Sequence, residues 1–153
     1  MTAAARHAGR ADHADAFRWP LRVYWEDTDA AGIVFYANYL KFFERARSEW
    51  LRSLGFEQEA LRASAGIGFV VTDTAVHYRE PARLDDVLEV TVQPVHVGLA
   101  SLTVAQQARR AGRLLAEGTI RVGCIDLGTF RPRRIPEDIL ARIREDERQQ
   151  ATR

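Results

Sequence analysis

Three carboxylates stand close together near the start of the chain, at Glu26, Asp27 and Asp29, and an Ala-Ala-Gly step follows them. A short apolar run comes next and leads into a segment with helical spacing. The first turn of a helix has unpaired backbone N–H groups and a partial positive charge, so it can stabilise a developing oxyanion. A carboxylate a few residues upstream could face those amides across a bound carbonyl group. This arrangement predicts acyl transfer or hydrolysis.

These carboxylates also have simpler structural interpretations. Aspartate side chains commonly accept hydrogen bonds from the backbone amides of a turn. Asp29, in its Asp-x-x-Gly setting, could have this structural role, and for Asp27 it is the favoured interpretation. With Glu26 they could bind a divalent cation, although their spacing lacks the regular ligand pattern of a calcium loop. Hydrolysis itself leaves two routes open, because Asp29 could attack the carbonyl directly or activate a water molecule.

The composition restricts the class of protein. The chain has 153 residues, enough for one domain with a substantial core, and its net charge of +1 gives no general attraction for nucleic acid. The single cysteine, Cys124, excludes an internal disulfide and a cysteine-based zinc site, and its apolar setting favours an inert thiol. No apolar run is long enough for a transmembrane segment.

The chain divides into three parts by composition. Residues 1–16 mix alanine with arginine, histidine and aspartate and lack the apolar stretch of a secretory signal. We expect them to be a disordered leader before a cytoplasmic domain. Residues 17–145 are predicted to form that single domain, and the polar residues 146–153 a frayed tail.

The elements that must position the acidic turn follow from the spacing of apolar residues. A strand is predicted at 17–25, a long amphipathic helix at 37–54, which Gly55 ends, and a short helix at 58–64. One face of the long helix carries large or apolar side chains, namely Tyr39, Phe42, Phe43, Ala46, Trp50 and Leu54. Such a wide face requires a broad partner surface.

Alternation with a period of two begins after Gly66. It predicts four strands in an antiparallel meander, with a hairpin turn at 110–112 and a terminal helix that begins near Pro136. The predicted fold class is therefore α+β, a five-stranded antiparallel sheet wrapped around one long helix. Long sheet edges favour pairing with a second copy of the chain.

Residues 26–39, EDTDAAGIVFYANY, resemble the entry motif of the hotdog-fold acyl-CoA thioesterases. They are most similar to the 4-hydroxybenzoyl-CoA thioesterase type and its Tol-Pal-associated YbgC branch, as are residues 43–47 and 81–86. The resemblance extends over residues 21–139. It implies the hotdog fold, an acyl-CoA thioester hydrolase, and no metal or bound cofactor, since CoA is part of the substrate.

Transferred by position, the resemblance implies catalytic roles for the Asp29 carboxylate and for the backbone N–H of Tyr36. The same motif implies substrate contacts at Gly32, Ile33 and Val34. Some members of the branch have a histidine where this chain has Tyr36, so the transfer concerns only the amide of that residue.

The contacts with CoA are expected elsewhere in the chain. In this family the region of Ser101 borders the pantetheine arm, and the hydroxybenzoyl type has basic residues near 98–101 that meet the phosphates. This chain lacks them there. Arg131, Arg133 and Arg134 could take that role, because arginine pairs with phosphate bidentately, or could form an exposed basic face.

The resemblance also implies a homodimer or homotetramer with its sites at subunit interfaces, an acyl-CoA substrate and, as a further partner, an acyl-carrier protein. The expected location is cytoplasmic, or at the periphery of the inner membrane.

Two other functions are open alternatives to the hydrolase. A hotdog hydratase or dehydratase is one of them, although it usually needs a histidine beside the carboxylate. A non-catalytic acyl-CoA or acyl-carrier-protein adaptor is another. His77 is interpreted as a structural histidine, and Glu44 as part of a solvated or salt-bridged face with Arg47.

Overall fold

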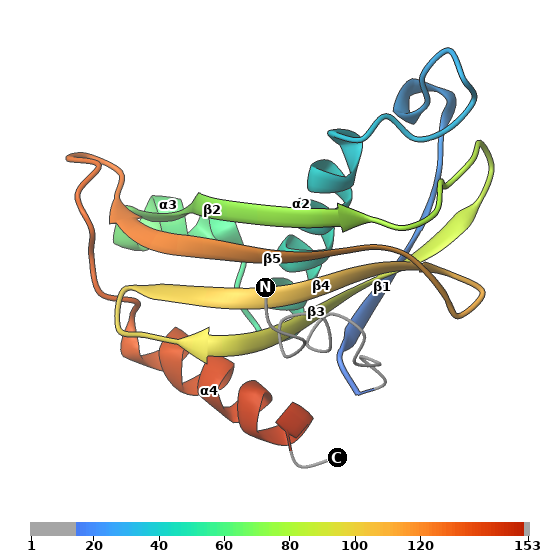
Figure 1. Ribbon diagram of the computed structural model, residues 1–153. Coiled ribbons are helices and arrows are strands. Elements are labelled where there is room, and N and C mark those ends of the chain that lie inside the picture. The colour runs from blue at the N-terminus through green and yellow to red at the C-terminus, as the bar shows by residue number, and fades with distance from the viewer. Residues whose placement is uncertain (1–14, 152–153) are drawn as a thin grey trace, which may run out of the picture.

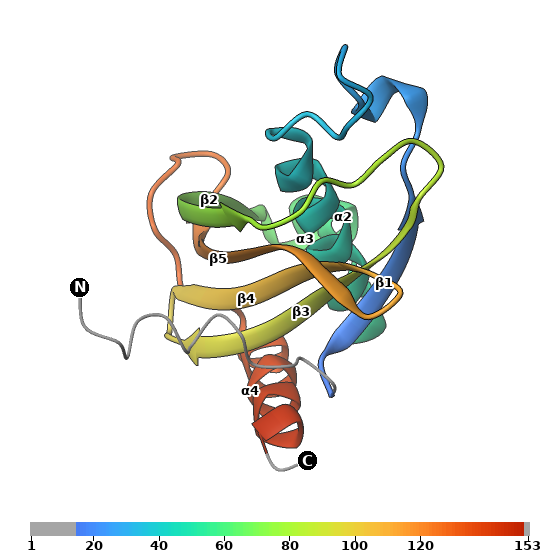
Figure 2. The ribbon, with the colours of Figure 1, turned by 45° about the vertical axis from the view of Figure 1, so that its right-hand side comes forward.

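The computed structural model describes residues 15–151, and its centre is helix α2 (Asn38–Ser53). A five-stranded antiparallel sheet curves around this helix (Figure 1; Figure 2). The strands are β1 (Phe17–Arg22), β2 (Ile67–Tyr78), β3 (Val87–Val97), β4 (Ser101–Arg110) and β5 (Arg113–Asp126). A 3-10 turn, η2 (Trp25–Asp27), and two further helices, α3 (Gln58–Ala65) and α4 (Glu137–Ala151), complete the chain. The expected leader falls mostly on residues 1–14, outside the described residues.

The strand order is β1-β3-β4-β5-β2 with every pair antiparallel, so the predicted sheet is confirmed but the predicted meander of its last four strands is wrong. Strands β3, β4 and β5 form a meander through short turns, and β2 pairs with the free edge of β5 instead of with β3. The link 79–86 is long enough to pass the end of the sheet between β2 and β3 (Figure 1).

The turn between β4 and β5 confirms the predicted hairpin. Ala111 and Gly112 have φ values of 49° and 79°, the two positive values that a two-residue turn needs to match the twist of the strands. Glycine adopts this conformation freely, whereas Ala111 does so at a steric cost.

Helix α2 buries its aromatic face against the sheet, as its spacing predicts. Tyr39, Phe42, Phe43, Ala46 and Trp50 are buried, and Leu51 is buried in place of the predicted Leu54, which lies at the margin of the core. Full burial of each large apolar side chain stabilises the fold by roughly 1.5–3 kcal/mol. The helix is thereby fixed along most of its length.

Helix α4 continues to Ala151, beyond residue 146, where the sequence predicts a frayed tail. Ile139 and Ile143 are buried in the core. Asp146 accepts hydrogen bonds from Trp50 Nε1 at 2.9 Å and from Gln150 Nε2 at 2.7 Å. A polar residue thus ties the last turns to α2, which hydrophobic spacing alone does not reveal. Among residues 15–151, no helix is long and apolar enough to cross a membrane.

Strand β2 forms one edge of the sheet, and within the part of the chain that the structure describes it pairs only with β5. Its twelve residues are largely exposed, including Val70, Val71 and Tyr78. A long edge with apolar side chains is a surface that a second chain can extend.

Candidate functional site

The predicted catalytic carboxylate lies on a small hairpin formed by residues 28–34. Thr28 pairs with Val34, and the amide of Asp29 donates to the carbonyl oxygen of Ile33 at 2.9 Å. Gly32 has a φ of 79°, which favours glycine at the turn. Asp29 is exposed, and its Oδ1 accepts the Ala31 amide at 2.8 Å. The turn-forming role is therefore present, while Oδ2 has no hydrogen bond within the described residues and remains available.

Asp27 has the structural role that the sequence predicts. It is 4% exposed, and its Oδ2 accepts the Tyr24 amide at 2.8 Å. Its carbonyl oxygen accepts the Phe35 amide at 3.0 Å and Asn38 Nδ2 at 2.8 Å. Asp27 therefore joins the base of the hairpin to the start of α2. In the described part of the chain, no group of three or more candidate ligands could hold a metal ion.

The start of α2 presents unpaired amides. Ala37 is the N-cap and has no side-chain cap, and the amide of Asn38 donates to Phe35 at 2.8 Å. Within residues 15–151, neither the Tyr36 amide nor the Ala37 amide donates to an acceptor. The first turn of α2 has no acidic residue, so its partial positive charge is not neutralised by the helix itself. The N-terminal end of α2 can therefore bind a negatively charged oxygen.

Three tyrosines surround this helix start. The hydroxyl of Tyr78, at the end of β2, donates to the carbonyl oxygen of Tyr36 at 2.9 Å. Its ring lies 5.4 Å from that of Tyr39 and 6.3 Å from that of Tyr36. Burial raises the pKa of Tyr78, and the neighbouring Tyr36 and Tyr39 raise it further. The hydroxyl therefore stays protonated, and remains a donor, at neutral pH.

The link 79–86 holds the second arm of the hairpin in place. The Val34 amide donates to Ala82 O at 2.9 Å, Ile33 pairs with Arg83, and the Ala82 amide donates to the hydroxyl of Tyr39 at 3.2 Å. Ala82 is fully buried. These bonds connect the hairpin, the link and α2 into one unit.

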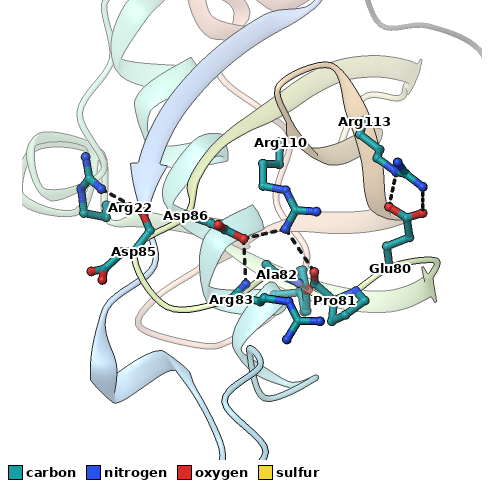
Figure 3. Close-up of polar contacts among 10 residues, drawn as sticks. Arg22, Glu80, Pro81, Ala82, Arg83, Asp85, Asp86, Arg110 and Arg113 are labelled. Atoms are coloured by element: carbon teal, nitrogen blue, oxygen red, sulfur yellow. Dashed lines mark hydrogen bonds and ion pairs between the residues drawn. The ribbon is translucent and has the colours of Figure 1, made fainter.

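An ion pair fixes the link itself (Figure 3). Asp86 Oδ2 accepts Arg110 Nη1 at 2.7 Å and the Arg83 amide at 2.8 Å. Burial acts to raise the pKa of Asp86, but these two hydrogen bonds and the charge of Arg110 outweigh it and lower the pKa below its ordinary value. Arg113 and Glu80 form a second, more exposed pair at the outer side of the link.

A cavity of about 150 Å³ lies further along α2, between the helix and the sheet. Its wall is mostly apolar, with Leu51, Phe69, Val71, Leu102, Val104 and Val122 among its residues. Neither Asp29 nor Tyr36 lines it.

Polar side chains of α2 and α3 occupy the rim of this cavity. Gln58 Nε2 donates to Ser48 Oγ at 2.9 Å, and Ser48 Oγ donates to Glu44 Oε1 at 2.7 Å. Arg47 donates to Gln106 Oε1 at 2.9 Å, and burial lowers its pKa although the charge of Glu44 acts to raise it. Glu44 is exposed, as predicted, but its hydrogen bond is to Ser48.

The predicted substrate contacts fall at two opposite ends of the sheet. Gly32, Ile33 and Val34 lie on the hairpin with Asp29, near the end of β2 at Tyr78. Ser101 begins β4, and Arg131 and Arg133 follow β5, at the other end (Figure 1). Strand β2 has 12 residues and rises about 3.3 Å per residue, so its two ends lie roughly 36 Å apart. One protomer does not bring the two groups together.

Two of the three arginines predicted to meet the phosphates, Arg131 and Arg133, are in different environments. Arg133 Nη1 donates to Ala65 O at 2.7 Å and lies 3.5 Å from Asp126 Oδ2. Arg131 is exposed, and its side chain has no hydrogen bond or ion pair within the described residues. Arg131 is therefore the freer of the two guanidinium groups.

The sequence does not predict Tyr78, Ala82 and the Asp86–Arg110 pair as supports of the site. Periodicity places Tyr78 in a strand but does not show which residues the end of that strand contacts. The similarity of residues 81–86 to the thioesterase motif was the one available signal for this link.

The fold and the helix start with its carboxylate hairpin define a class of protein. The sequence profile of the thioesterase-like superfamily matches residues 23–143, and the chain belongs to that superfamily. This range includes both the hairpin and the link that supports it. The predicted hotdog fold and the predicted resemblance to acyl-CoA thioesterases are thereby confirmed.

Within the superfamily, the chain is similar to proteins named YbgC. Acyl-CoA thioesterase YbgC of Haemophilus influenzae is 42% identical over 127 residues, which cover 83% of this chain and 93% of that protein. Acyl-CoA thioester hydrolase YbgC of Escherichia coli O6:H1 is 44% identical over 130 residues, with coverages of 84% and 96%. A probable thioesterase from Bartonella henselae superposes with a TM-score of 0.75 at 32% identity, covering 78% of this chain and 98% of that one.

Proposed function

We propose that the protein hydrolyses acyl-CoA thioesters between the 28–34 hairpin and the start of α2. The observation that carries the proposal is that an exposed carboxylate, Asp29, lies on the hairpin that leads directly into a helix start, where the Tyr36 and Ala37 amides have no acceptor within residues 15–151. The names of the YbgC relatives support an acyl-CoA substrate.

In this mechanism the thioester oxygen accepts the N–H of Tyr36. The negative charge that develops on that oxygen is stabilised by the amide and by the positive end of α2. Asp29 either attacks the carbonyl carbon, giving an anhydride that water then hydrolyses, or removes a proton from an attacking water. In both routes the C–S bond breaks, CoA leaves as a thiolate that is protonated, and a carboxylic acid is released.

The hairpin contributes backbone contacts beside the carboxylate. Gly32 allows the chain to turn, and the amides of Ile33 and Val34 belong to the arm that the 79–86 link supports. We place the thioester against this arm, so that Gly32, Ile33 and Val34 contact the substrate next to the reacting carbonyl.

The acyl group is proposed to follow α2 toward the cavity. Leu40, 42% exposed, lies one turn beyond Tyr36, and Glu44 at the cavity rim lies one turn further. The rise of 1.5 Å per residue puts the rim about 12 Å from Tyr36. We expect thiol release from linear acyl-CoAs to increase with chain length until the chain enters the cavity. A series from acetyl-CoA to dodecanoyl-CoA measures this, and equal rates throughout the series would contradict it.

A homodimer through β2 would complete the site. Antiparallel pairing of two β2 edges about a twofold axis puts the beginning of one strand beside the end of the other. Ser101, Arg131 and Arg133 of the partner subunit would then approach the Tyr78 end of the first protomer, where Asp29 lies. We propose that these arginines meet the CoA phosphates and that Ser101 borders the pantetheine arm. A thioester on an acyl-carrier protein would enter by the same route.

The Asp29→Asn variant tests the hydrolase. We expect kcat to fall by about 10³-fold or more, since asparagine is neither a base nor a nucleophile here. The fold should persist, because the asparagine Oδ1 can still accept the Ala31 amide, and a non-hydrolysable thioether analogue of acyl-CoA should still bind. The assay is thiol release over aliphatic, malonyl-type and aromatic acyl-CoAs, with calorimetry for binding.

The matched control is Asp27→Asn, which changes a buried structural carboxylate two residues away. It should lower the melting temperature more than Asp29→Asn does. Turnover in Asp29→Asn equal to that of the unmodified protein would remove Asp29 from the mechanism. No thiol release by the unmodified protein on any substrate would favour the adaptor.

Co-expression of two impaired variants tests the shared site. A protomer with Asp29→Asn and a protomer with Arg131→Ala and Arg133→Ala each lack one half. In a mixed dimer, one of the two sites has both halves intact if they come from different subunits, so activity at low acyl-CoA concentration should recover. No recovery in mixed dimers would place each site within a single protomer.

The hydratase alternative receives no support from the described residues. Their histidines, His77 and His96, are exposed on β2 and β3. His77 precedes Tyr78, so the alternation of a strand directs it to the opposite face from the helix start. A cytoplasmic location stays a prediction of the sequence.

A further inference from the structure

Tyr78 reaches the start of α2 from the sheet, across 42 residues of sequence, and donates its hydroxyl to Tyr36 O at 2.9 Å. Its ring packs edge-on against the rings of Tyr36 and Tyr39. The N-cap of α2, Ala37, has no side chain that could fix the first turn. A side chain from an edge strand therefore holds a peptide unit at the helix start.

The peptide unit in question carries an unpaired donor. A trans peptide is planar with its C=O and N–H on opposite sides, and the carbonyl of Tyr36 shares its unit with the N–H of Ala37. A hydrogen bond to that carbonyl therefore sets the direction of the Ala37 N–H. It also polarises the unit, which makes this N–H a stronger donor. Within residues 15–151 the Ala37 N–H donates to no acceptor.

We propose that Tyr78 is a positioning residue for thioester hydrolysis, which orients the Tyr36–Ala37 peptide so that the Ala37 N–H is a second donor to the oxyanion. This inference rests on the proposed function and adds to it a donor and the residue that directs it. Tyr78 touches neither substrate nor reacting atoms; it acts through the backbone.

The hydroxyl can perform this role throughout the neutral range. Burial, followed by the neighbouring Tyr36 and Tyr39, raises the pKa of Tyr78, so the phenol keeps its proton. The hydroxyls of Tyr78 and Tyr39 also serve different partners. Tyr39 accepts the Ala82 amide, which supports the link 79–86 but does not contact the peptide unit at the helix start.

The first test compares Tyr78→Phe with the matched control Tyr39→Phe. Each removes one hydroxyl and keeps the ring. Tyr78→Phe should lower kcat about tenfold and leave KM unchanged, because complete loss of an oxyanion donor costs about 10²–10³-fold and this donor is misdirected, not removed. Tyr39→Phe should instead lower the melting temperature. A kcat of Tyr78→Phe equal to that of the unmodified protein overturns the proposal.

The second test measures the substrate carbonyl directly. Acyl-CoA with a ¹³C-labelled thioester carbonyl is bound to the full-length Asp29→Asn protein, which holds it unhydrolysed, and its C=O stretch is recorded by infrared difference spectroscopy. Hydrogen bonds from the helix start should shift the stretch to lower frequency than in water. In the double variant that carries both Asp29→Asn and Tyr78→Phe, a clear part of this shift should be lost. In the double variant with Asp29→Asn and Tyr39→Phe, the shift should stay the same.

The outcomes separate the two proposals. If Asp29→Asn alone shows no downshift, the oxyanion site of the proposed function is wrong. If the downshift is present and Tyr78→Phe does not change it, only the role of Tyr78 is wrong. If Tyr78→Phe abolishes binding instead, Tyr78 is a binding residue and the positioning role is overturned.

If the Tyr78→Phe variant does not fold, 3-fluorotyrosine can replace Tyr78. It keeps the hydroxyl as a stronger donor, so it should increase the downshift of the C=O stretch. An unchanged stretch overturns the proposal.

Discussion

The two ends of α2 differ in the exposure of their side chains, in the pairing of their backbone amides and in their packing. At the N-terminal end, Tyr36 and Leu40 are exposed, two amides have no acceptor within residues 15–151, and single hydrogen bonds from β2 and the 79–86 link hold the backbone. At the C-terminal end, Trp50 and Leu51 are buried, and Trp50 is hydrogen-bonded to Asp146 of α4. One helix thus joins an end with exposed side chains and unpaired amides to an end that is packed on apolar side chains.

This difference separates stability from the proposed chemistry. Burial at the C-terminal end supplies free energy of folding without any requirement for exact orientation of the backbone. The N-terminal end leaves donors unpaired, which costs stability but allows them to bind a substrate oxygen. Substitutions at the two ends should therefore have opposite signatures.

Trp50→Ala should have the largest effect on stability. Removal of a buried tryptophan ring leaves a cavity and frees Asp146, and we expect the free energy of unfolding to fall by about 3–5 kcal/mol. Below the lowered melting temperature, kcat for acetyl-CoA, whose acyl group is too short to reach the cavity that Trp50 lines, should stay close to that of the unmodified protein. Urea titration and thiol release measure the two quantities.

The control for this prediction is Trp25→Ala. Trp25 is 83% exposed, so its removal should change the free energy of unfolding by only about 0.5 kcal/mol or less. Equal destabilisation by both substitutions would contradict the assignment of stability to the buried end.

Tyr36→Pro should give the reverse signature. Proline has no N–H, and the Tyr36 amide donates to no acceptor within the described residues, so no intrachain hydrogen bond there is lost. We expect kcat to fall by about 10²–10³-fold, the usual cost of one oxyanion donor. Tyr36→Ala removes the same ring but keeps the amide and should retain most of the activity. Equal losses in both variants would assign the effect to the side chain.

Local patterns predicted most of this architecture. The aromatic stripe of α2 and the alternation in β3 and β4 specify which faces are buried, because both periods are properties of the chain itself. The burial of Leu51 and the helical turns beyond Asp146 were missed, since neither follows from local spacing; α4 is held by contacts with β3 and by the hydrogen bond from Trp50 to Asp146, which are distant in sequence. The strand order was missed for the same reason: the pairing of β2 with β5 depends on contacts distant in sequence.

The candidate site was predictable only in part. The Asp29 hairpin and the Tyr36 amide are close in sequence, so a local motif contains both. Tyr78 and Asp86 support that motif from other elements, and no spacing rule connects them to it. Ser101 and Arg131 lie at the far end of β2, where the sequence could not show their distance from Asp29. Their proposed contribution depends on a second chain.

Asp86→Asn should have the smallest effect and should show how the functional end depends on pH. The folded pKa of Asp86 is lowered, so its carboxylate contributes stability above the unfolded pKa and loses this contribution as the pH falls through the folded value. The pair with Arg110 is partly exposed, and we expect a difference of about 1 kcal/mol or less. Urea titrations should show that difference at pH 6–7, and it should shrink as the pH falls below the ordinary aspartate pKa of about 4. A difference that persists unchanged at the lowest pH would mean that packing, not charge, holds the link beneath the hairpin.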